Sequence, residues 1–165
     1  MRFVLDGMLG KLTRWLRMMG HDAIYLNDAK DRDLVTTATK ENRILLTSDV
    51  ALYRLATARG ADVYLVKGRT EAERLASLAR RFKLDLSVDT ADSRCPVCGS
   101  SLNIIPKEKV KEKIPPATFN AFNEFWTCSN SECAKVYWKG SHWENIHAVL
   151  EKAEEIRRAS HTSGD

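Results

Sequence analysis

Short apolar runs rich in β-branched residues alternate with longer stretches of helical period between residues 3 and 82, and this alternation limits the possible folds. The short runs lie at residues 3–6, 23–26, 43–49 and 61–66, and the helical stretches at residues 8–19, 34–40, 51–59 and 72–82. Such a pattern predicts four strand-helix units. Parallel neighbours need crossover helices, which then cover the sheet. We therefore expect an α/β fold with a parallel sheet and helices on both faces.

The first predicted helix has two different faces. One is apolar and is expected to pack in the core; it consists of Met8, Leu12, Trp15, Leu16 and Met19. The other carries a basic residue at every third position, namely Lys11, Arg14 and Arg17, and faces either water or a ligand. Gly20 after this helix and Gly60 after the third are expected to end them, because glycine tolerates positive φ.

The residue composition of the chain changes after residue 83, where a polar and turn-rich stretch leads to the first cysteine. We place a boundary there, with one α/β unit at residues 1–90 and a smaller unit at residues 91–165. A helical period returns at residues 143–159. The sequence contains no export signal and no run of eighteen apolar residues, so we expect a soluble cytoplasmic protein without membrane association.

All four cysteines fall in the second unit as two close pairs. Cys95 and Cys98 have two residues between them, and Cys128 and Cys133 have four. This spacing predicts a structural Zn²⁺ site with four thiolate ligands and no open position for water. Two disulfides or four unrelated buried thiols are the alternatives, but a reducing compartment favours metal.

Several other residues of the second unit have two interpretations. His142 and His147 either replace a metal ligand or are surface or packing residues. Four aromatic residues are interpreted as a substitute for a large core, with stacking on nucleic acid as the alternative: Trp126, Tyr137, Trp138 and Trp143.

Three aspartates are predicted at one edge of the sheet. Asp6 ends the first strand, Asp49 ends the third, and Asp31 begins the helix after the second. Ligands of open α/β sheets bind at the carboxyl ends of the strands. Clustered carboxylates bind Mg²⁺ or Mn²⁺, which can activate water for phosphodiester hydrolysis. The alternative is that each aspartate only caps a helix.

Other side chains near these aspartates are possible helpers. Asp28 and Asp33 are reserve ligands, or are merely solvated or helix caps. Thr47 and Ser48 are placed to orient Asp49 by hydrogen bonds.

The net charge of +4 lies in the first 90 residues and favours a polyanionic partner, although a surface selected for solubility gives the same value. Neither glycine-rich phosphate-binding motif, G-x-G-x-x-G or G-x-x-x-x-G-K-[ST], occurs, which disfavours a nucleotide-binding enzyme.

These residues resemble a known family, the PIN-like ribonucleases named for the C-terminal domain of the Mut-seven protein. The segments that carry the resemblance are residues 3–22, Asp31, RILLTSD at 43–49, the CPVCG knuckle, Trp126 with Cys128, and YWKGSHW at 137–143. The sequence departs from the family pattern in two respects. Ser48 stands where a basic residue is usual, and the second cysteine pair has four intervening residues in place of two.

The resemblance implies a PIN-like domain at residues 1–90 and a zinc ribbon with a C-terminal helix at residues 91–165. It implies an endoribonuclease-like site in which Asp6, Asp31 and Asp49, with Asp33 nearby, bind Mg²⁺ or Mn²⁺, and a ribbon that helps to bind RNA. We therefore expect RNA hydrolysis, with the basic row of the first helix contacting phosphates. The rival hypothesis is a non-catalytic RNA-binding adaptor.

Overall fold

The computed structural model describes residues 1–159; residues 160–165 of the predicted second unit lie outside the described residues. Four parallel strands form the first sheet, in the order β2-β1-β3-β4. Their bounds are Arg2–Leu5 for β1, Asp22–Tyr25 for β2, Ile44–Thr47 for β3 and Val63–Leu65 for β4. The predicted parallel α/β sheet is confirmed.

Helices cover both faces of this sheet because successive strand residues point to opposite sides. Phe3 and Leu5 pack with α1 and α4, whereas Val4 packs with α2 and α3. The crossover elements are η1 (Gly7–Leu9), α1 (Gly10–Met18), α2 (Asp31–Lys40) and α3 (Val50–Ala58), and α4 (Glu71–Phe82) follows the last strand. The prediction that Gly20 ends a helix is confirmed by its φ of +84°, which side chains other than glycine rarely tolerate.

A second, antiparallel sheet follows, in the order β5-β6-β7. Its strands are β5 (Leu102–Ile105), β6 (Phe125–Cys128) and β7 (Val136–Tyr137), and the excursion between β5 and β6 contains η2 (Lys107–Val110) and α5 (Pro116–Ala121). A small core lies under this excursion, with Val110, Ile114 and Phe125 buried and Trp138 packed against them. The second unit therefore has a core of its own.

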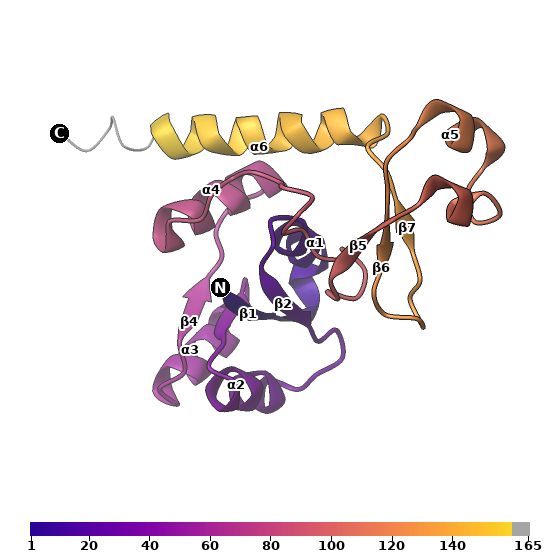
Figure 1. The fold of residues 1–165 in the computed structure, drawn as a ribbon. Helices are drawn as coiled ribbons and strands as arrows, with labels where there is room; N and C mark the ends of the chain where they lie inside the picture. Colours follow the sequence, from indigo (N-terminus) through magenta and orange to yellow (C-terminus); the bar gives the residue numbers. More distant parts are fainter. Residues whose placement is uncertain (160–165) are drawn as a thin grey trace.

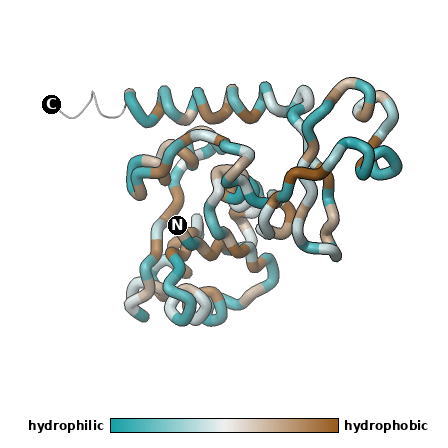
Figure 2. Tube along the Cα trace, in the orientation of Figure 1, coloured by the Kyte–Doolittle hydropathy of each residue, from teal (hydrophilic) through white to brown (hydrophobic). Residues whose placement is uncertain are grey.

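The last helix, α6 (His142–Ala159), leaves the second unit and lies along α4 (Figure 1). Hydrophobic and hydrophilic positions alternate along it (Figure 2). Leu150 and Ala153 are buried in the same core as Leu75 and Leu78 of α4. The chain thus returns to the first unit after forming the second, which its sequence period alone did not indicate. None of the helices in the described part is both long and apolar enough to cross a membrane.

Candidate functional site

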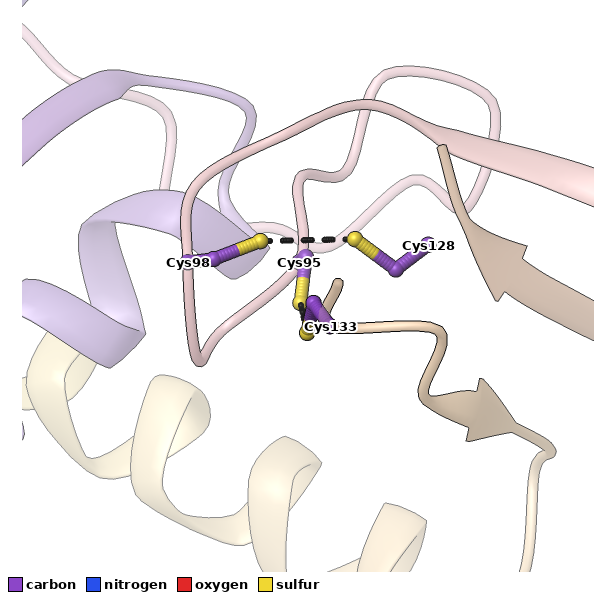
Figure 3. A group of neighbouring side chains, drawn as sticks. All are labelled: Cys95, Cys98, Cys128 and Cys133. Carbon is purple, nitrogen blue, oxygen red and sulfur yellow. Dashed lines mark hydrogen bonds between the residues drawn. The ribbon is translucent and has the colours of Figure 1, made fainter. Parts of the chain in front are cut away.

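The four cysteines converge on one point (Figure 3). Their sulfur atoms all lie within 4.8 Å of one another, with 3.3 Å between Cys98 and Cys128 and 3.7 Å between Cys95 and Cys133. Sulfurs bound to one tetrahedral Zn²⁺ at about 2.3 Å lie about 3.8 Å apart, so these positions suit such an ion. All four thiols are free, which argues against the disulfide alternative. Among the described residues, neither His142 nor His147 belongs to this group.

Local backbone geometry forms the first half of the cluster. The Gly99 amide donates to the Cys95 carbonyl at 2.8 Å, and the Cys95 amide donates to the Ser100 carbonyl at 2.8 Å. Gly99 has a φ of +82°, and a Cβ at this position would lie 3.1 Å from Nε of Arg17. The glycine is therefore required both by the turn and by the side chain packed against it.

The electrostatics of the cluster fit a cation. Burial raises the pKa of Cys98, but hydrogen bonds from Ser100 outweigh this effect and hold it at about 6. Burial raises the pKa of Cys128 to about 12 and also raises that of Cys133. Four neighbouring thiols cannot all ionise by themselves, because each thiolate opposes the next. A divalent cation removes this conflict by stabilising every thiolate at once.

Arg17 differs from the sequence-based expectation. It was grouped with Lys11 and Arg14 as a nucleic-acid contact, but its side chain is buried and 7% exposed. Its Nε donates to the Ala23 carbonyl at 2.8 Å, and its Nη1 donates to the carbonyls of Pro96 and Val97 at 3.1 and 2.8 Å. Burial lowers the pKa of Arg17. Arg17 therefore joins α1 to the cysteine knuckle, and its role was missed because its partners lie about 80 residues away.

Lys11 and Arg14 are exposed, as expected of a basic row that faces solvent or a ligand. They line a hollow of about 460 Å³ together with Tyr25 and Val97. The hydroxyl of Tyr25 donates to the carbonyl of Gly7 at 2.9 Å, directly after Asp6. The basic hollow therefore begins next to the predicted acidic edge and ends at the cysteine knuckle.

Asp6 and Asp49 follow β1 and β3, which are neighbours in the sheet. Asp6 is buried, and its carboxylate accepts hydrogen bonds from the Met8 amide at 2.8 Å and from the hydroxyl of Thr47. The same Thr47 oxygen accepts the Asp49 amide at 2.9 Å. Thr47 thus connects the two acidic positions, and it orients Asp49 through the backbone. The Ser48 hydroxyl instead contacts the Met8 sulfur at 3.8 Å.

Two of these aspartates also cap helices. The Asp49 carboxylate accepts the Ala51 amide at 2.6 Å at the start of α3, and Asp6 caps η1. Asp31 is exposed in the first turn of α2, where Lys30 is the N-cap residue, and Asp33 is exposed beside it. Within residues 1–159, the carboxylates of positions 6, 31 and 49 do not form a group whose ligand atoms all lie within 4.8 Å. A shared metal at these positions remains a prediction.

Comparison with known proteins gave one family. A family model described as the Mut7-C RNAse domain matches residues 1–150 of the 165. Comparisons with curated proteins and with solved structures gave no match. The matched region includes the parallel sheet, the four cysteines and the first half of α6.

Proposed function

Because the chain belongs to the Mut7-C RNAse domain family, we propose that it is a metal-dependent ribonuclease that hydrolyses RNA at the carboxyl edge of the parallel sheet. The family description itself suggests a ribonuclease-like function. The observation that carries the finer proposal is the hydrogen-bonded link from Asp6 through Thr47 to Asp49 at the ends of two neighbouring strands. We assign residues 1–90 to a PIN-like domain on the same basis.

Asp6 and Asp49 would hold a catalytic Mg²⁺ or Mn²⁺. Mg²⁺ keeps several of its waters and needs only one or two protein carboxylates, so a site of this kind does not require Asp31 in direct contact. Asp31 and Asp33 would then act through water on the exposed side. When bound, the ion supplies an activated water and neutralises charge on the scissile phosphate.

The protein residues around this edge have separate tasks. Thr47 donates to Asp6, which keeps one carboxylate oxygen fixed. The exposed ammonium of Lys11 and guanidinium of Arg14 lie in the adjoining hollow, where they would neutralise phosphates of the bound strand. The basic row proposed for RNA contact therefore consists of these two residues, without the buried Arg17.

The cysteine cluster has a structural task in this proposal. Four thiolates close the coordination sphere of Zn²⁺, which leaves no position for water or substrate. The ion would join the 95–98 turn to β6 and to the loop before β7, and so form a zinc ribbon. Arg17 holds the carbonyls of that turn against α1, so the ribbon keeps a fixed position beside the basic hollow.

The test is cleavage of a labelled mixed RNA pool with Mn²⁺ and with chelator. Asp6→Asn and Asp49→Asn should each lower the Mn²⁺-dependent rate at least about a hundredfold, because a metal ligand supplies several kcal/mol of transition-state stabilisation. RNA affinity should stay close to that of the parent protein. Asp62→Asn is the matched control: it makes the same charge change at the amino end of β4 and should cleave normally. Unchanged rates in both edge variants would refute the assignment.

The capping hydrogen bonds of Asp6 and Asp49 favour one second candidate, a non-catalytic RNA-binding adaptor. An adaptor binds RNA equally with Mn²⁺ and with chelator and never shortens it. In that case the asparagine variants would change only the free energy of unfolding, since they weaken two caps.

A further inference from the structure

A pocket of about 170 Å³ lies between the two units, where the end of α1, the strands β6 and β7 and the start of α6 meet. Its wall is mostly apolar and contains Trp126, Tyr137, Trp143, Met18 and Pro96. From this pocket we infer a binding site for one unpaired nucleobase of single-stranded RNA. The inference rests on the proposed function and extends it to a second contact outside the acidic edge.

Three of the aromatic residues in the wall lie outside the small core under the excursion between β5 and β6. That core consists of Val110, Ile114 and Phe125, and of the wall aromatics only Trp138 packs against it. Trp126, Tyr137 and Trp143 lie outside it and line the pocket. Trp126 is itself only 8% exposed, and the Tyr137 hydroxyl is hydrogen-bonded to the Cys95 sulfur at 3.1 Å, so both also stabilise the second unit. Trp143 is half-buried, and for this ring the stacking alternative is favoured.

The charge beside these rings suits an anionic strand. The ammonium of Lys139 lies 5.5 Å from the ring centroid of Trp126 and 5.3 Å from that of Trp143. A protein cation already occupies the ring faces, so the site does not call for a cationic ligand. A neutral planar base can stack on the half-buried ring of Trp143 while the flexible lysine moves outward to the phosphate of that nucleotide.

The size of the pocket limits what can enter. Pockets that enclose a whole drug-sized ligand have volumes of about 300 to 1,000 Å³. A volume of about 170 Å³ admits a single ring system and leaves the sugar and phosphate outside. This is the arrangement in which single-stranded RNA is bound by aromatic side chains.

Pro96 links the pocket to the proposed catalytic edge. It lines both the aromatic pocket and the hollow that contains Lys11 and Arg14. A strand that is held at the acidic edge can therefore follow the basic hollow, cross the knuckle at Pro96 and insert a base beside Trp143. The knuckle is held in place for this path by Arg17.

The experiment measures equilibrium binding of a labelled oligoadenylate, and of an abasic ribose-phosphate strand of equal length, to the zinc-loaded full chain. An Asp6→Asn background keeps the probe intact. Trp143→Ala should weaken oligoadenylate binding by about five- to 150-fold, the equivalent of one lost base stack, and leave the abasic strand unaffected. Trp143→Phe should retain most of the affinity because it keeps a ring.

Lys139→Ala and Lys107→Ala form a matched pair. Each removes one positive charge that lies over an aromatic ring, but Lys107 lies 4.9 Å from Phe119, outside the pocket. The Lys139 variant should bind oligoadenylate clearly more weakly than the Lys107 variant, which should stay within about twofold of the parent protein. If Trp143→Ala fails to fold, this pair tests the phosphate contact, and the preference of the parent protein for oligoadenylate over the abasic strand tests the base.

Three results would overturn the inference: oligoadenylate binding to Trp143→Ala at parental affinity, an equal loss for the abasic strand, or equal effects of the two lysine variants. Quenching of tryptophan fluorescence by tetramethylammonium but not by adenosine monophosphate would assign the pocket to cations instead. The proposed function fails separately. If the protein binds RNA through Trp143 but never cleaves it, the pocket assignment holds and the nuclease assignment is wrong. If the protein cleaves RNA but Trp143→Ala binds RNA with parental affinity, the nuclease assignment holds and the pocket assignment is wrong.

Discussion

Replacing Arg17 with methionine removes the guanidinium that joins α1 to the cysteine knuckle and keeps most of the apolar stem. Two of its nitrogen atoms make three hydrogen bonds, to the carbonyls of Ala23, Pro96 and Val97. The side chain is only 7% exposed, so water does not readily replace these bonds. The variant should therefore be less stable and should hold its knuckle more loosely.

The magnitude follows from the two nitrogen atoms. A hydrogen bond from a charged donor contributes about 1.5–3 kcal/mol. With the two bonds of Nη1 counted as one, the two nitrogen atoms contribute about 3–6 kcal/mol. The retained apolar stem and water that reaches the knuckle carbonyls reduce this value. We expect Arg17→Met to lower the free energy of unfolding by about 3 kcal/mol.

Urea unfolding of the zinc-loaded protein measures this loss, and the rate of zinc transfer to a chelator measures the loosening of the knuckle. Arg14→Met is the control, because Arg14 is exposed one turn earlier on the same helix and should change stability by no more than about 0.5 kcal/mol. Zinc transfer should be faster only in the Arg17 variant. Equal stability and equal transfer rates for the two variants would refute the reasoning.

Three further predictions concern other residues. Thr47→Val should lower the RNA cleavage rate by about tenfold and the free energy of unfolding by about 1–2 kcal/mol, because it removes the hydroxyl that bonds Asp6, whereas Thr47→Ser should restore both in the same assays. Burial, and then the N-terminal ammonium, lower the pKa of His21 to about 4. The imidazole of His21 therefore binds a proton more tightly in the unfolded chain than in the folded protein. Urea titrations should show that the free energy of unfolding falls by about 2 kcal/mol as the pH falls from about 6.5 towards 4. His21→Gln should not show this loss. Cys128→Ser should reduce zinc content from one ion per chain to near zero in elemental analysis, since three thiolates leave the site open, and retention of zinc at the parental level would contradict the assignment of this ligand.

The candidate site was only partly predictable from the sequence. The positions of Asp6 and Asp49 after apolar runs placed both at one sheet edge, because parallel strands have their carboxyl ends together. The spacing of the cysteine pairs predicted their convergence. The hydroxyl of Thr47 was expected to act on Asp49, but its bond to Asp6 depends on β1 and β3 being neighbours, and a local pattern does not contain strand order.

The sequence by itself determined the four strand-helix units, the ends of the helices and the cysteine pairs, since each depends on residues within a few positions of one another. Only the tertiary structure decided the strand order, the burial of Arg17, the return of α6 to α4 and the pocket beside Trp143. These features come from contacts between segments far apart in the chain. The local sequence around a basic residue on a helix is the same whether its side chain faces water or a carbonyl 80 residues away in the chain. Only the tertiary structure determines which of the two it contacts.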